Sequence, residues 1–208
     1  FSWISYLDPT ITNVVPVLNS YWLMIHVSVI VSSYGFLIMG GFLGLLSLIL
    51  MIFKSNKNKE IINSKISELT IINEKTLIIG LFMLTIGTFL GGVWANESWG
   101  RYWGWDPKET WARVSILVYA FILHMRFVPG LQGKHTFNVA SVIGVYSVLM
   151  TYFGVNYLLS GLHSYAAGDK VSIPMSVWVS VFIVFLIIFL SKIQEYNNKK
   201  REEATTVL

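Results

Sequence analysis

The sequence lacks cysteine altogether and contains little charge. None of its 208 residues is Cys, which excludes disulfides, thiolate metal sites, thiol redox chemistry and a Cys-x-x-Cys-His haem attachment site within this chain. Charged residues make up 12%, against about 25% in average globular proteins. Hydrophobic residues make up 54%, and the mean hydropathy is +0.62. A soluble enzyme and a disordered tail are therefore excluded, and the composition is typical of a polytopic membrane protein.

Hydrophobic runs near or beyond the roughly 20 residues that cross a bilayer core predict the architecture. We expect an all-α membrane helix bundle with about five transmembrane helices, over 21–53, 76–94, 111–128, 136–159 and 173–193. Residues 61–74 have helical periodicity with a polar side, so we expect this stretch to lie in the membrane interface. The chain begins with Phe1, and we expect one membrane domain over 1–208 within a longer polypeptide.

Lysine and arginine are unevenly distributed over the two sides of this predicted bundle. Four lie on one side: Arg101, Lys108, Arg113 and Lys170. The other eleven of the fifteen lie on the opposite side. Because basic residues are retained on the cytoplasmic face, we expect the 1–20 arm, the 95–110 loop and the 160–172 loop outside, and the 194–208 tail in the cytoplasm. The net charge of +4 thus marks topology and does not indicate a nucleic-acid partner.

Five of the eight tryptophans lie between Trp94 and Trp111. An aromatic belt at the membrane interface accounts for these two, which stand at span ends, but leaves Trp99, Trp103 and Trp105 unexplained. The latter three alternate with glycines, which permit a tight backbone that turns flat indole faces to one side. This pattern favours a platform for a large planar ligand.

Charged residues in and after this window suggest how such a ligand is held. Arg101, Lys108 and Arg113 can pair with acidic groups on its rim. Asp106 and Glu109 have the spacing of a helix N-cap and capping box, so we expect Glu109 to cap the third span. For Asp106, capping and fixing the loop around the ligand stay open.

Two of the four histidines are predicted at the outer face, at the level of this loop. His26 lies about one turn into the first span, and His163 follows the fourth. A histidine beside an apolar span is costly unless partnered, and either one alone fits an interhelical hydrogen bond as well as a ligand role. Two at matching depth beside an aromatic platform favour axial ligation of haem iron. The second-shell acceptor that would fix each ring is not identifiable from sequence.

The other two histidines lie deeper. His124 is thirteen residues beyond Trp111, so it lies roughly 20 Å further towards the cytoplasmic side. It is either an interhelical hydrogen-bonder among apolar neighbours or half of an inner ligand site. We expect His135 to be a surface loop residue.

Several motifs resemble one known family. The run from Trp99 to Trp111 resembles the tryptophan-rich WWD signature of haem-handling proteins in cytochrome c maturation. The supporting motifs are Trp22-Leu-Met-Ile-His26-Val, Leu123-His124-Met-Arg126, Gly154-Val-Asn-Tyr and Gly161-Leu-His163-Ser-Tyr165. Within that superfamily the chain is more similar to the system II members of the CcsA type than to the system I proteins CcmC and CcmF.

This resemblance implies a site and its ligand. It implies transient binding of haem b, with His26 and His163 as axial ligands of the iron. Trp99, Trp103, Trp105 and Asp106 would shape the platform, and Arg101 would steady a propionate. His124 corresponds to a membrane histidine that pairs with one on an earlier helix, which these residues lack.

The resemblance also implies a role and partners. The chain would hold haem at the outer face of a bacterial inner membrane and present it to apocytochrome c for attachment to its Cys-x-x-Cys-His motif. It would act as a subunit of a cytochrome c synthase of the haem lyase type, among membrane lipids, with a CcsB-type partner that is fused or separate.

Three alternatives stay open. A redox subunit that retains its haem also needs paired histidines, and a transporter of another planar anionic ligand would bind no iron. A purely structural lid is the third, and it leaves two outer histidines unexplained.

Overall fold

The computed structural model describes residues 20–159 and 173–206, with side chains as far as Arg201. Every regular element in these ranges is a helix, so the all-α fold class is confirmed for them. The predicted 1–20 arm and the 160–172 loop, which carries His163, lie almost wholly outside the described residues. The elements are α2 (Tyr21–Ile52), α3 (Lys59–Trp99), α4 (Pro107–His124), η3 (Met125–Phe127), α5 (Lys134–Leu149), η4 (Met150–Gly154), α6 (Val155–Leu158) and α7 (Met175–Thr206).

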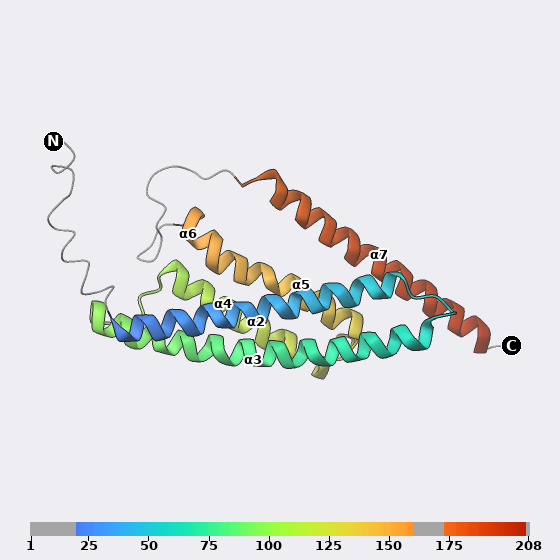
Figure 1. Ribbon diagram of the computed structural model, residues 1–208, viewed down its shortest axis with the longest axis horizontal. Helices are drawn as coiled ribbons and strands as arrows, with labels where there is room; N and C mark the ends of the chain where they lie inside the picture. The colour runs from blue at the N-terminus through green and yellow to red at the C-terminus, as the bar shows by residue number, and fades with distance from the viewer. Residues whose placement is uncertain (1–19, 160–172, 207–208) are drawn as a thin grey trace.

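An antiparallel pair of long helices, α2 and α3, runs the length of the molecule (Figure 1). The turn between them is tied by Asn58, whose Oδ1 accepts from the Ser55 backbone N–H at 2.7 Å and whose Nδ2 donates to the Phe53 carbonyl at 3.2 Å. The 41 residues of α3 make a helix about 60 Å long, well beyond the bilayer core. Residues 61–74 are helical as predicted, but they continue into the next span and do not form a separate element.

Four helices among the described residues have the length and hydropathy to cross a membrane: Tyr21–Ile52, Lys59–Trp99, Lys134–Leu158 and Met175–Arg201. The chain is therefore a multi-pass helical membrane protein. The remaining predicted span, 111–128, is present as α4. This helix begins at Pro107 and is followed by a 3-10 turn after His124. Its first two turns carry three charged residues, Lys108, Glu109 and Arg113, so α4 is too polar to count among these four helices.

The predicted 136–159 span contains a π-helix. After α5, residues Met150–Gly154 form this wider turn before α6. Thr151 Oγ1 lies 3.0 Å from Ser115 Oγ on α4 and donates at 3.2 Å to the Trp111 carbonyl. The π turn is therefore fastened to α4 by a buried polar contact.

Two glycine pairs, Gly40 with Gly44 on α2 and Gly87 with Gly91 on α3, have the small-xxx-small spacing that indicates close helix packing. A Cβ on Gly40 would collide with Leu77 of α3, and one on Gly44 would collide with Ser141 Oγ and lie 2.9 Å from the Asn138 carbonyl of α5. Between these helices, Asn73 Nδ2 donates to Ser141 Oγ at 2.9 Å and to Asn138 Oδ1 at 3.2 Å. The crossing of α2, α3 and α5 is held by close backbones and a buried amide network.

Helix α7 joins the bundle through its second half. Val184, Ile187 and Ile188 pack against a buried cluster that includes Leu48 and Met51 of α2. The predicted span ended at 193, whereas the helix runs on to Thr206, so the described part of the 194–208 tail is helical.

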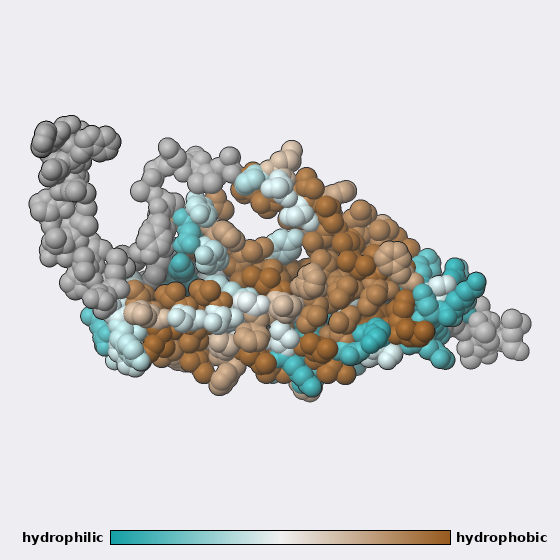
Figure 2. Space-filling view, viewed as in Figure 1, coloured by the Kyte–Doolittle hydropathy of each residue, from teal (hydrophilic) through white to brown (hydrophobic). Residues whose placement is uncertain are grey.

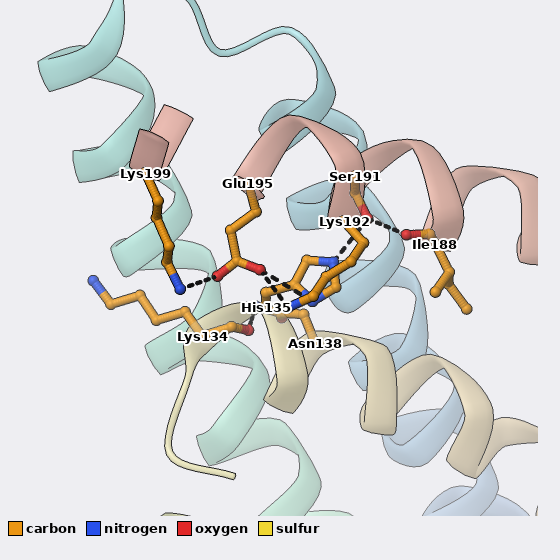
Figure 3. A network of polar contacts seen from close by, with 8 residues as sticks. All are labelled: Lys134, His135, Asn138, Ile188, Ser191, Lys192, Glu195 and Lys199. Atoms are coloured by element: carbon orange, nitrogen blue, oxygen red, sulfur yellow. Dashed lines mark hydrogen bonds and ion pairs between the residues drawn. The ribbon is translucent and has the colours of Figure 1, made fainter. Parts of the chain in front are cut away.

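His135 contradicts its prediction as a surface loop residue. It lies in the first turn of α5 with 7% of its surface exposed, because α7 covers it. Its Nε2 is 3.0 Å from Ser191 Oγ, and its Nδ1 is 3.8 Å from Glu195 Oε2. Figure 3 shows Glu195 between His135 and Lys199, which forms a second ion pair with it at 3.3 Å. This cluster fastens α7 to α5.

Apolar side chains dominate the face of the molecule shown in Figure 2, over α2, α3 and α7. Hydrophilic residues gather at the end where α7 finishes, near the turn between α2 and α3. There Gln194 Nε2 donates to the Lys54 carbonyl at 2.8 Å. The structure thus separates a lysine-rich end from the end that carries the Trp-rich loop, while the side of the membrane that each occupies stays a prediction.

Two glycines of α2 provide a matched test of this packing. We expect Gly44→Ala to lower the free energy of unfolding by about 1–3 kcal/mol, since the neighbouring carbonyl of α5 cannot rotate away. Gly35→Ala is the control, because a Cβ there meets nothing within 4 Å and alanine favours the helix. Thermal midpoints of the purified protein in detergent measure both, and equal midpoints would contradict the close packing at Gly44.

Candidate functional site

The Trp-rich loop of the structure is Gly100–Asp106, shorter than the predicted 95–110. Helix α3 continues through Trp94 to Trp99 and ends at Gly100, which has φ +69 and donates to the Asn96 carbonyl at 2.9 Å. Glycine suits this position because a left-handed residue with a side chain is strained. The chain therefore turns sharply out of α3 and enters α4 seven residues later.

A capping box fixes the end of the loop on α4, as the spacing of Asp106 and Glu109 predicts. Asp106 Oδ2 accepts from the Lys108 backbone N–H at 3.1 Å. Glu109 Oε2 accepts from the backbone N–H groups of Asp106 at 3.2 Å and Gly104 at 2.8 Å. Both carboxylates also lie at the positive end of the helix dipole. Glu109 is thus a structural capping residue that also holds the loop.

Trp105 has a left-handed backbone with φ +58, which is rare for a bulky residue and costs about 1–3 kcal/mol. Glu109 accepts from the backbone N–H groups of Gly104 and Asp106, which flank Trp105. The capping box therefore keeps Trp105 in its strained backbone conformation. The indole is 68% exposed, and the Arg113 guanidinium lies 5.9 Å from its centroid. Strain that holds a large apolar side chain in the open is typical of functional sites.

The indoles form two edge-to-face pairs. Trp94 and Trp99 have centroids 4.7 Å apart, and Trp103 and Trp105 have centroids 5.9 Å apart at 89°. Within the described part of the chain, Trp103 Nε1 is buried and has no hydrogen-bond partner. Buried indole N–H groups usually find an acceptor, so this donor fits an acceptor supplied by a ligand.

His26 lies against a glycine groove on α3. Its Nδ1 is 2.7 Å from the Gly87 carbonyl, and because a carbonyl can only accept, Nδ1 donates. A Cβ on Gly91 would come within 2.6 Å of His26 Cε1, so the ring occupies space that only glycine leaves. In the neutral ring, a donating Nδ1 leaves the lone pair on Nε2, which is the form in which histidine binds a metal.

One turn of α3 brings His26 and the loop together. Gly91 faces the His26 ring, and a Cβ on its neighbour Gly92 would lie 3.2 Å from the Tyr102 carbonyl. His26 and the Trp-rich loop thus both contact the same turn of α3, while their association in one ligand site stays a prediction. His163, the other predicted ligand, lies outside the described residues.

The other two predicted cations, Lys108 and Arg101, also contact the protein. Lys108 Nζ donates to Asn156 Oδ1 of α6 at 3.2 Å, and partial burial lowers the pKa of this amine while Asp106 raises it. The Arg101 guanidinium lies over Gly104, where a Cβ would come within 2.9 Å of its Cζ. That these cations pair with a ligand stays a prediction.

His124 is exposed, and its Nδ1 donates to the Ala120 carbonyl at 2.6 Å in its own helix. An interhelical bond was one alternative for this residue, and the bond described here is intrahelical. Leu117 and Phe121 beside it are 62% and 56% exposed. A cavity of about 120 Å³ lies nearby, between α3 and the chain from Leu123 to Phe137, away from the Trp-rich loop.

Sequence reasoning missed Gly87, Gly91 and Asn156 as parts of this site. The Gly87-xxx-Gly91 spacing signals a close approach of helices, but it does not say that a histidine fills the space. Among the described residues, no group of three His, Cys, Asp or Glu side chains could hold a metal ion. A metal here would need ligands of another arrangement, such as an axial histidine.

The sequence matches a known protein family over most of its length. The family model described as "Cytochrome C assembly protein" matches residues 2–163. The chain belongs to this family. The match includes both predicted outer histidines, the Trp-rich loop and His124, and it ends before α7.

Relatives with curated names support the membership and the predicted CcsA type. The chain is 57% identical over 166 residues to "Protein NrfI" of Wolinella succinogenes, covering 80% of this chain and 18% of that protein. It is 42% identical over 180 residues to "Cytochrome c biogenesis protein CcsA" of Prochlorococcus marinus, covering 74% of this chain and 57% of the relative. The protein of that name in Chlamydomonas reinhardtii is 46% identical over 151 residues, covering 73% of this chain and 42% of the relative. The chain thus spans 18% to 57% of these relatives' lengths.

Variants of the capping box test how the Trp-rich loop is held. We expect Glu109→Ala to raise hydrogen exchange at Gly104 and Asp106, since each backbone N–H loses its acceptor at a cost of about 1 kcal/mol. Glu109→Gln retains an acceptor oxygen and should retain most of the protection. Exchange measured by mass spectrometry on the loop peptide would contradict the assignment if the two variants were alike.

Proposed function

We propose that this chain handles haem in cytochrome c maturation: it holds haem beside the Trp-rich loop and presents it for covalent attachment to apocytochrome c. The observation that carries the proposal is the junction on α3, where Gly91 seats His26 and the next residue meets the backbone of the loop. The family and the names of its relatives support a role in cytochrome c assembly.

The contacts of His26 support a role as an axial ligand. Its ring is held by the Gly87 carbonyl, which is the kind of second-shell acceptor that orients a metal-bound imidazole and raises its basicity. A neutral ring with Nε2 as its lone-pair atom suits axial ligation of haem iron. His163 is proposed as the opposite ligand, from its motif and from the family match, which reaches that residue.

The loop supplies apolar faces and charges suited to haem. Trp103 and Trp105 offer indoles at right angles, and the buried N–H of Trp103 fits an acceptor such as a propionate. Arg101 and Arg113 stand on the same loop and on the first turns of α4, where they would pair with the propionates. Trp99 and Asp106 complete the proposed platform, Trp99 at the end of α3 and Asp106 as the N-cap.

Haem in this role is cargo, and its vinyl groups supply the chemistry. Each reduced thiol of a Cys-x-x-Cys-His motif adds across one vinyl group, so that sulfur bonds to carbon and the proton is retained on the product. The chain contributes no cysteine. Its residues bind and orient the haem, as part of a synthase with a CcsB-type partner.

The proposal places the Trp-rich loop and both outer ligands at the outer face of a bacterial inner membrane. The lysine-rich end would then face the cytoplasm, in keeping with retention of basic residues on that side. His124, lower on α4, is proposed to form half of an inner haem site completed by another segment, and its exposure supports access from a neighbouring helix.

Imidazole rescue tests the outer ligands. In the full-length protein expressed with its partner, we expect the wild type to carry b-type haem with low-spin absorption bands. His26→Gly and His163→Gly should each lose these bands, and added imidazole should restore them because it fills the vacated space. The pyridine haemochrome measures haem content beside each spectrum.

The control for this experiment is His135→Gln, a histidine at the opposite end of the bundle. Its spectrum should match the wild type. A wild type without haem, or unchanged spectra in both ligand variants, would reject the proposed function and favour a transporter of another ligand. Haem that never exchanges with apocytochrome would favour a redox subunit.

The glycine seat of His26 can be tested separately. We expect Gly91→Ala to shift part of the haem from low-spin to high-spin, since the new Cβ displaces the ring that it would meet at 2.6 Å. Gly35→Ala on α2 should leave the spin state unchanged. Electron paramagnetic resonance of the oxidised protein measures the spin state, and a wild-type spectrum for Gly91→Ala would count against His26 as the ligand.

A further inference from the structure

One polar contact joins the first turn of α4, directly after the Trp-rich loop, to α6. Lys108 Nζ donates to Asn156 Oδ1 at 3.2 Å, although the two residues are 48 positions apart. Both side chains are half-buried. A charge-assisted hydrogen bond is strengthened where water is partly excluded. The contact is therefore well suited to hold two segments at a fixed separation.

On the loop side, Lys108 is rigidly connected. Its backbone N–H donates to Asp106 Oδ2 at 3.1 Å, and the next residue, Glu109, holds Gly104 and Asp106. Any displacement of Lys108 is transmitted to the strained segment that carries Trp105.

On the α6 side, the π-helix brings two polar residues towards α4. In a regular α-helix, Thr151 and Asn156 would point about 140° apart, since each residue turns by 100°. The π turn is wider, and Thr151 contacts Ser115 and Trp111 while Asn156 contacts Lys108. Both residues thus fasten the same short stretch to α4. The first described range ends at Leu159, and His163 lies outside it.

We propose that Lys108 is a positioning residue: through Asn156 it fixes the distance between α6 and the start of α4, and so the placement of the Trp-rich loop that Asp106 and Glu109 tie to that helix. This inference rests on the proposed function for its role in haem ligation. It differs from a direct role of Lys108 at a haem propionate, because the amine acts here through a neutral amide on a neighbouring element.

Distances in the protein without haem test the link itself. This chain contains no cysteine, so Tyr102→Cys and Tyr157→Cys, both exposed, add one spin label each to the loop and to α6. We expect Lys108→Met and Asn156→Leu to broaden the distance distribution measured by double electron–electron resonance to the same extent, with no further broadening in the double variant. Lys75→Met, an exposed lysine of α3, is the control and should leave the distribution narrow.

Ligand competition in the haem-loaded, full-length protein tests the consequence. Loss of the link should loosen the loop that holds haem, so exogenous imidazole should bind about tenfold more tightly to either variant, as expected for the loss of one charged hydrogen bond. Asn156→Asp, which keeps an acceptor for the lysine, should behave as the wild type.

The outcomes separate the two proposals. An unchanged distance distribution in Asn156→Leu overturns the link, whether or not haem is bound. Loss of haem in Lys108→Met with wild-type behaviour in Asn156→Leu also overturns it, because Lys108 would then contact the ligand directly. A wild type that carries no haem rejects the proposed function, and with it the role of the link in haem ligation.

Discussion

The close approach of α2 and α3 is the constraint on which the rest of the bundle depends. Inside a bilayer no hydrophobic force favours one apolar helix contact over lipid, so association requires tight packing and polar contacts. Three glycines of α3 accept side chains of α2: Gly80 accepts Leu37, Gly87 accepts Ile30 and Gly91 accepts His26. The same groove that lets the helices pack thus also orients the predicted haem ligand, so stability and site geometry share one set of residues.

Strain and capping are joined in the same way at the loop. Trp105 holds a backbone conformation that a free chain would leave, and the carboxylate of Glu109 maintains it by binding the N–H groups on both sides. A residue that starts α4 therefore also determines where an exposed indole stands. The helix and the loop form one structural unit.

Much of this arrangement could be predicted from local patterns. Hydropathy located the helices, the spacing of Asp106 and Glu109 gave the capping box, and glycine pairs gave the close contacts. What could not be predicted depends on residues far apart in sequence. The acceptor for His26 is a main-chain carbonyl 61 residues away, and no side-chain pattern marks it. His135 follows a short loop and is predicted to be exposed, yet α7 covers it through Ser191, 56 positions later. The π turn at Met150–Gly154 lies within an apolar run whose sequence shows no feature that predicts it.

The continuity of α3 has a mechanical consequence. A helix without a break or a proline is a stiff rod, whose hydrogen-bonded backbone resists twisting over its whole length. Its lysine-rich beginning and the groove that seats His26 belong to this one rod, about 60 Å long. The lysine-rich end and the groove are therefore held at a fixed separation by the hydrogen-bonded backbone of a single helix.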